Sequence, residues 1–148
     1  MPILIFFLLI FCISFQDLYS KDEYFLTLRN EKVNLRQGPS FDYPVKILYK
    51  KKFLPVLIQD SSDNFRKIRD HENNSGWIHI SQLSKKKAAI VTSEQLIMFN
   101  SSTVYSNPIA LLKKGRLVKI KKCNDNWCKA ISGDFMGWLK KEGLWGLL

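Results

Sequence analysis

Short runs of β-branched, aromatic and aliphatic residues recur along this 148-residue chain, separated by clusters of Gly, Pro, Asn, Asp and Ser. Such runs between turn-forming residues are typical of antiparallel strands, and no segment sustains helical periodicity. The pattern therefore predicts an all-β fold. The expected strands are 25–28, 33–35, 45–48, 54–59, 65–69 and 77–80 in the first half, and 89–92, 96–99, 109–112, 117–121, 127–131 and 137–139 in the second.

The second half of the chain repeats the first. ILYKKKFLPVLIQDSSDNFRKI, which begins at Ile47, aligns without a gap with IALLKKGRLVKIKKCNDNWCKA, which begins at Ile109. Further on, Gly76-Trp77-Ile78 matches Gly137-Trp138-Leu139 after the loss of a residue in a predicted hairpin turn. Two units of about 60 residues are each near the lower limit for an independent core, so we expect them to pack on one another.

The first residues predict a leader. The apolar run from Ile3 to Ile13 is too short to cross a bilayer, which needs roughly 20 residues, but it suits the core of a secretory signal peptide. A retained anchor or a core strand is the alternative interpretation. The expected organisation is a signal peptide at 1–20, a first domain at 21–84, a short linker at 85–88 and a second domain at 89–148.

Charge narrows the class of partner. The chain has 23 Lys and Arg against 13 Asp and Glu, a formal net charge of +10, and removal of the leader would take away Asp17 and no basic residue. An exported basic protein is attracted to cell-wall carboxylates, anionic lipid head groups and glycans more than to nucleic acid. Solubility is the plainer interpretation of the same charge.

Cys123 and Cys128 flank the tetrapeptide Asn-Asp-Asn-Trp, and could form a metal clamp, a redox pair or a bridge. A closed zinc site needs about four ligands, and a redox pair would prefer Cys-x-x-Cys at the start of a helix. In an oxidising compartment a cysteine pair at the ends of a hairpin favours a bridge. We therefore predict a disulfide, no metal site and no cofactor.

The residues available for catalysis are few. His71 and His79 are the only histidines, and neither lies in a zinc-protease, nucleophile-elbow or P-loop motif. A triad of Ser81, His79 and Asp70 can be assembled only by selection among many serines. We predict no catalytic residues and no enzymatic activity.

VNLRQGPSFDYPV, followed by DNFRKIR and GWIHISQL, resembles the bacterial SH3-like domain family (SH3b), whose signature is a Val-Asn-x-Arg-x-Gly-Pro-Ser opening and a Gly-Trp-hydrophobic closing strand. The resemblance covers 33–83. The second copy, 90–145, keeps the centre and the Gly-Trp but replaces the opening with QLIMFNSSTVYSNPI, so it is a degenerate member. The family implies two tandem, small, partly open SH3-like β-barrels packed together, each with five to six strands and used as a binding or targeting module in the envelope.

Within this framework Val33 and Leu35 are expected to point inward, and Trp77 and Trp138 to fill the two barrels. Arg36 has two possible roles. It could meet a ligand carboxylate, or it could pin the opening loop together with Asn34 by hydrogen bonds to backbone carbonyls, which is the favoured interpretation.

The candidate ligand-binding residues are Arg36, Phe41, Tyr43, Lys51 and Lys52. Aromatic rings can stack on sugars or peptide stems while basic groups meet carboxylates. The alternative is that the aromatic rings are buried and the lysines merely solvated. The predicted function is a non-catalytic periplasmic or extracellular module that binds peptidoglycan or another anionic envelope polymer. A scaffold for another exported envelope protein is the alternative, and neither version includes a membrane span after processing.

Export with removal of the leader is the first testable prediction. Mass spectrometry of the protein recovered from the envelope is expected to show a new N-terminus near Lys21, with cleavage after Ser14 as the competing site. An intact Met1 in a cytosolic fraction would contradict it.

Overall fold

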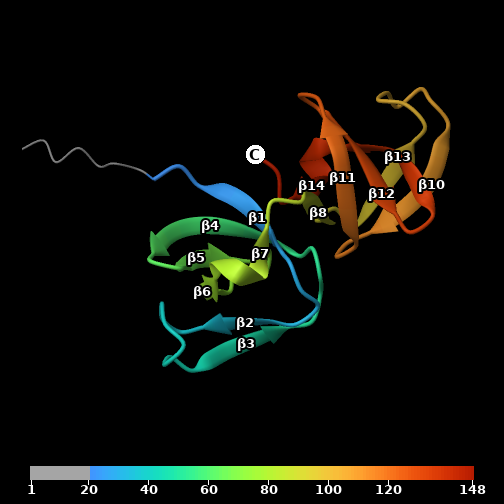
Figure 1. Cartoon of the computed structure of the whole chain (residues 1–148). Helices are drawn as coiled ribbons and strands as arrows, with labels where there is room; N and C mark the ends of the chain where they lie inside the picture. The colour runs from blue at the N-terminus through green and yellow to red at the C-terminus, as the bar shows by residue number, and fades with distance from the viewer. Residues whose placement is uncertain (1–20) are drawn as a thin grey trace, which may run out of the picture.

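The computed structural model describes residues 21–148, and the predicted signal peptide lies outside them. The described residues contain strands and two short 3-10 turns but no α-helix. They form two seven-stranded antiparallel sheets, each of which curls into a small barrel (Figure 1). The predicted all-β fold of two tandem barrels is confirmed.

The two barrels have the same strand order, β3-β2-β6-β5-β4-β1-β7 and β10-β9-β13-β12-β11-β8-β14. The first consists of β1 (Tyr24–Leu28), β2 (Val33–Arg36), β3 (Val45–Tyr49), β4 (Pro55–Ser62), β5 (Phe65–Arg69), β6 (Ser75–His79), the turn η1 (Ile80–Gln82) and β7 (Leu83–Ser84). The second consists of β8 (Ala88–Val91), β9 (Gln95–Phe99), β10 (Pro108–Lys113), β11 (Leu117–Cys123), β12 (Trp127–Ser132), β13 (Phe135–Lys140), the turn η2 (Lys141–Gly143) and β14 (Leu144–Trp145).

Strands β7 and β14 were not predicted. Each is two residues long, too short to show alternation. β7 exists because Leu83 and Ser84 pair with Leu28 and Thr27 of β1, which lies at the other end of the domain in sequence. Ile80, predicted as the end of a strand, begins the 3-10 turn η1 instead.

The two cores are built from equivalent positions of the repeat. Val56 and Val118 are completely buried, and Ile78 and Leu139 close the cores from the strands β6 and β13. The predicted inward positions Val33 and Leu35 are buried as expected. Side chains at alternate positions of the strands thus fill each barrel, as the period of a pleated strand requires.

The prediction that Trp77 and Trp138 fill the barrels is wrong, because both are partly exposed and neither belongs to a core cluster. The inward positions of these strands are taken by a glycine and by the residue after the tryptophan. At Gly76 an added Cβ would lie 2.7 Å from the carbonyl oxygen of Arg36, and at Gly137 it would lie 2.6 Å from that of Phe99. Since neighbouring side chains on a strand point to opposite faces, an inward glycine turns the tryptophan outward.

The two barrels pack against each other through apolar side chains. Ile90 of β8 belongs to the core of the first barrel, and Leu117 packs against that core. The ring of Trp145 meets that of Phe25 edge to face, with centroids 4.9 Å apart. Next to it, Gly146 approaches Pro55 so closely that an added Cβ would lie 2.9 Å from the proline ring. Each small domain thus buries part of its apolar surface against the other domain.

The predicted disulfide between Cys123 and Cys128 is confirmed. The two residues are directly opposite one another on β11 and β12, and Cys128 is completely buried. In the first barrel Ser61 and Arg66 occupy the corresponding paired positions, so the fold forms there without a bridge.

Asp70 is a buried carboxylate held by four hydrogen bonds. It accepts from the hydroxyl of Tyr49, from the side chain of Asn74 and from the backbone N–H groups of Asn74 and Glu72. Burial alone would raise the pKa of Asp70, but these bonds together hold that pKa below its ordinary value. Burial and the bond to Asp70 raise the pKa of Tyr49.

Asp70→Asn is expected to lower the free energy of unfolding at neutral pH by about 1–3 kcal/mol, because an amide has one acceptor oxygen where the carboxylate has two. A lowered folded pKa means that the wild-type contribution is present above the unfolded pKa of about 3.9 and is lost as the pH falls through the folded value. Urea unfolding at pH 7 and at pH 2 measures both effects. The difference in the free energy of unfolding between pH 7 and pH 2 should therefore be smaller in the variant than in the wild type. An equal difference in the two proteins would contradict this account.

Reduction of the disulfide is expected to lower the free energy of unfolding by about 2 kcal/mol, since the closed loop is only six residues long. Urea unfolding with and without dithiothreitol measures this loss. Alkylation of the unreduced, denatured protein should leave Cys123 and Cys128 unlabelled, and labelling of both would contradict the bridge.

Candidate functional site

The opening loop of the first barrel, 37–44 between β2 and β3, is pinned by Arg36. Its Nη1 donates hydrogen bonds to the carbonyl oxygens of Phe41, at 3.2 Å, and Tyr43, at 2.9 Å. The ring of Tyr43 lies directly against Gly38, where there is no room for a Cβ. The favoured interpretation, that Asn34 and Arg36 pin the loop, is confirmed for Arg36. The backbone N–H of Asn34 donates instead to Gln82 Oε1, at 3.2 Å, outside the loop.

The loop places Phe41 on a small group of rings. Its centroid lies 5.2 Å from that of Phe65 and 5.1 Å from that of His79, and the guanidinium carbon of Arg36 lies 5.3 Å from it. Phe65 is buried, whereas Phe41 is 62% exposed and Tyr43 47% exposed. We call Arg36, Phe41, Tyr43, Phe65 and His79 the aromatic face. It is an accessible aromatic surface, on which Phe65, His79 and Arg36 hold the ring of Phe41 in position.

Phe65 and His79 were not predicted as site residues. The signal for Phe65 was present in the repeat, since Asp-Asn-Phe of the first copy matches Asp-Asn-Trp of the second. The signal for His79 was its position two residues after Trp77 on a strand, which places both side chains on the outer face.

His79 and Ser81 lie together, with His79 Nδ1 2.8 Å from Ser81 Oγ. Asp70 is not part of this pair. Phe65 pairs with His79 at one end of the β5–β6 ladder, and Asp70 follows Arg69 at the other end, where it bonds to Tyr49. The three residues considered for a triad are therefore not brought together.

Lys51 and Lys52 lie away from the aromatic face. Val33 pairs with Tyr49 and Arg36 with Val45, so the turn that follows Tyr49 and the loop that follows Arg36 are at opposite ends of β2 and β3. The five predicted residues therefore form two separate places on the surface, and the exposed Lys51 and Lys52 belong to the second.

The second barrel has the same opening loop, at 100–107, which the sequence alignment did not find. Gln37 N–H donates to Pro44 O at 3.1 Å, and Asn100 N–H donates to Asn107 O at 2.9 Å. The loop has no arginine to pin it; instead Ser106 Oγ donates to the carbonyl oxygens of its own loop, with Thr103 O at 2.8 Å. Two different sets of side chains thus support one backbone conformation.

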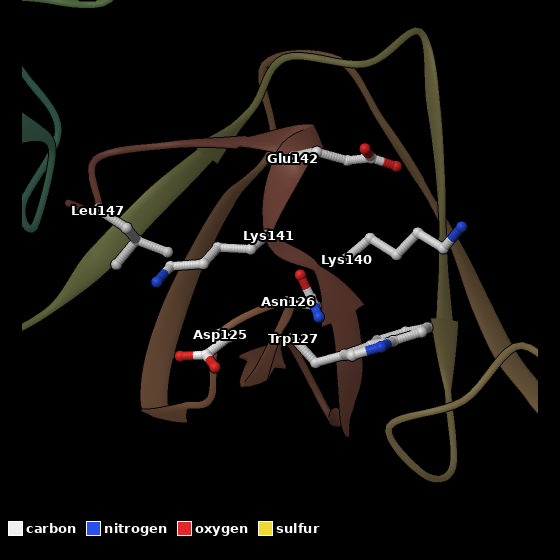
Figure 2. Close-up of a pocket in the computed structure, with 7 residues that line it drawn as sticks. All are labelled: Asp125, Asn126, Trp127, Lys140, Lys141, Glu142 and Leu147. Atoms are coloured by element: carbon white, nitrogen blue, oxygen red, sulfur yellow. The ribbon is translucent and has the colours of Figure 1, made fainter.

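Beside the position that corresponds to the aromatic face, the second barrel has an open groove of about 620 Å³, which includes Trp127 and Lys140 of that position. Trp127 stands where Phe65 stands in the first barrel, and Lys140 stands where His79 stands. Figure 2 shows Lys140 extending to the same side as the indole of Trp127, and Lys141 pointing the other way, towards Leu147 and Asp125. The groove is lined by Asp125, Asn126, Trp127, Lys140, Lys141, Glu142 and Leu147.

Within residues 21–148, no three His, Cys, Asp or Glu side chains are close enough together to hold a metal ion. This part of the chain also contains no helix that could cross a membrane.

A protein-family model described as a bacterial SH3 domain matches the chain twice, at residues 29–85 and at residues 93–146. No curated protein matches the chain.

Three solved structures are similar to the chain at low identity. NlpC2 from Trichomonas vaginalis is 13% identical over 86% of this chain and 49% of its own, with a TM-score of 0.39. NlpC1 from the same organism is 12% identical over 85% of this chain and 46% of its own, with a TM-score of 0.38. An NlpC/P60 family protein from Bacillus cereus is 10% identical over 82% of this chain and 55% of its own, with a TM-score of 0.37. The chain spans about half the length of the solved structures it matches.

Proposed function

The chain belongs to the bacterial SH3 domain family, and on that premise we propose that it is a non-catalytic binding module of the cell envelope. The proposed ligand is peptidoglycan or another anionic envelope polymer, and the proposed binding surface is the aromatic face of the first barrel. The observation that carries the proposal is the exposed ring of Phe41, held against Phe65 and His79.

A fixed aromatic ring suits a binding role because little freedom is lost when a ligand stacks on it. Phe41 is held from three directions, by two rings and by the guanidinium of Arg36. Its own carbonyl and that of Tyr43 are tied to the same arginine. The face of a sugar ring or of a stem peptide is a matching apolar surface.

Charge supplies the attraction and the second set of contacts. Both loop bonds of Arg36 use Nη1, and the guanidinium has further donors in a fixed fork that can meet a carboxylate. Lys51 and Lys52 lie at the far end of β3, so they would contact a different stretch of an extended polymer. This arrangement favours a long ligand over a small molecule.

The disulfide and the charge are compatible with the export that the proposal requires. The Cys123–Cys128 bridge is of a kind that persists in oxidising compartments such as the periplasm and the cell exterior. The net charge of +10 suits the anionic polymers found there.

The absence of catalysis is part of the proposal. A triad acts through a histidine that is oriented by a carboxylate, and Asp70 is bonded to Tyr49 and Asn74 at the other end of the β5–β6 ladder. His79 packs instead against both Phe41 and Phe65, as part of the aromatic face.

One observation favours the alternative, a scaffold for another exported protein. The second barrel exposes large apolar side chains, with Leu111 and Phe135 each 51% exposed and lining a second groove, separate from that of Trp127. Ile97, opposite Leu111 on the neighbouring strand, is 43% exposed. Clustered apolar exposure of this kind is typical of protein interaction sites.

The two functions predict different results in co-sedimentation with purified cell-wall sacculi. Wild-type protein is expected to bind at low salt and to keep part of its affinity near 0.5 M salt, where the screening length is only about 4 Å. Phe41→Ala/Tyr43→Ala is expected to lower the affinity roughly thirtyfold, since removal of central aromatic contacts costs about 2 kcal/mol.

Val104→Ala/Tyr105→Ala is the matched control, because these two exposed residues occupy the equivalent loop of the second barrel. It should leave binding unchanged. No sedimentation at low salt, or equal effects of the two double substitutions, would contradict the proposal and favour the scaffold.

A further inference from the structure

Three lysine side chains from three separate segments converge on one aromatic ring. The Nζ atoms of Lys52, Lys86 and Lys119 lie 5.2, 5.6 and 4.9 Å from the centroid of Phe53. Lys52 belongs to the turn before β4, Lys86 to the link between the barrels, and Lys119 to β11 of the second barrel. The cluster is therefore assembled only when both barrels have folded and packed. It lies outside the aromatic face and shares only Lys52 with the residues of the function proposed above.

The backbone of Phe53 has a conformation that is unfavourable for a bulky residue. Its φ is +65°, in the left-handed region where a bulky side chain is rarely found. The equivalent position of the second barrel is Gly115, whose φ is +88°. The turn thus suits a glycine, and in the first barrel an aromatic ring is present in spite of the backbone cost. A residue kept under such strain indicates that its side chain has a role.

The backbone around the cluster is fixed on every side. The buried Thr27 donates its hydroxyl to Lys86 O at 2.7 Å, and Ile120 N–H donates to Lys87 O at 3.0 Å, so the link is bonded to both barrels. Phe53 N–H donates to Leu28 O at 2.9 Å. Figure 1 shows this link running between β7 and β8 where the two barrels meet. The backbone around these lysines is therefore held by hydrogen bonds, and only their side chains are left to move.

The charge of the cluster is not balanced by the protein. The three ammonium nitrogens lie 4.9–5.6 Å from one ring centroid. Any two of them are therefore no more than about 11 Å apart, which is comparable to the screening length of about 8–10 Å at 0.1–0.15 M ionic strength. No salt bridge within residues 21–148 involves any of these lysines. A cavity beside the link is lined by Lys85, Lys86 and Lys87 and by no acidic side chain. An anion would relieve the mutual repulsion.

We infer that Phe53, Lys52, Lys86 and Lys119 form a binding site for a phosphate group at the junction of the two barrels. Three separate ammonium donors match an ion with at least three acceptor oxygens better than a carboxylate, which has two. The negative faces of the Phe53 ring attract the ammonium groups, which favours their gathering around the ring before the anion arrives. The phosphate can come from a soluble phosphate ester or from a lipid head group.

The test uses inorganic pyrophosphate as the soluble probe and phosphatidylcholine vesicles with and without phosphatidylglycerol as the lipid probe. Calorimetric titration of the intact protein with pyrophosphate at constant ionic strength is expected to show one site per chain. Sedimentation with phosphatidylglycerol vesicles that pyrophosphate reverses would identify the head group as a second source. Sedimentation that pyrophosphate does not affect would overturn the assignment for lipid.

The variant Lys52→Gln/Lys86→Gln/Lys119→Gln is expected to weaken pyrophosphate binding by about tenfold or more. The control Lys46→Gln/Lys67→Gln/Lys113→Gln removes the same charge from strands β3, β5 and β10 and should change affinity by less than about twofold. Phe53→Gly reproduces the residue found at Gly115, so the circular dichroism spectrum should be unchanged while binding weakens.

Equal losses in the two triple variants would show a general charge effect and overturn the site. Failure of pyrophosphate to bind the wild type at low ionic strength would do the same. Equally tight binding of tricarballylate, which carries three carboxylates, would overturn the assignment to phosphate.

Discussion

The close crossing of β6 over β2 is the contact on which the rest of the first barrel depends. At Gly76 there is no room for a Cβ beside Leu35 and the carbonyl of Arg36, and Gly137 makes the same contact in the second barrel. The missing side chain lets the sheet curl until Arg36 pairs with Trp77. Because the glycine faces inward, Ile78 closes the core and Trp77 and His79 face outward. The aromatic face follows from that alternation, since His79 and Arg36 are thereby brought beside Phe41.

The second barrel acts as an internal comparison for the first. Its opening loop keeps the same backbone hydrogen bonds with almost no residue in common, so the loop is a property of the fold. What differs is the side chains that the loop presents. Phe41 becomes Val104 and Phe65 becomes Trp127, whose ring packs edge to face on that of Phe99 with centroids 5.7 Å apart. An open groove lies beside this pair (Figure 2). The structural role of Arg36 is transferred to Ser106, which shows that an arginine is not required to hold the loop.

Packing of the barrels on one another gives the pair a fixed geometry. Trp145, at the end of the second barrel, packs on Phe25 at the start of the first, and Ile90 joins the first core. The link between them is hydrogen bonded to both sides. A surface on the first barrel and a surface on the second thus keep a fixed distance and orientation relative to each other. This is the condition under which two weak contacts with one polymer reinforce each other.

Local sequence information was enough to predict most of the strands, the two barrels and the disulfide of this protein. Alternating apolar residues and turn-forming clusters located the principal strands, and the repeat and the SH3-like signature indicated two barrels of one family. The Cys123–Cys128 bridge followed from spacing across a single hairpin. Each of these features depends on residues that are near one another in the chain. Only the tertiary structure decided which way Trp77 and Trp138 face, that Lys52 lies apart from Phe41, and that Lys52, Lys86 and Lys119 meet at Phe53. These depend on how tightly two strands cross and on how two domains pack, and such contacts join residues whose separation in the sequence carries no periodic signal.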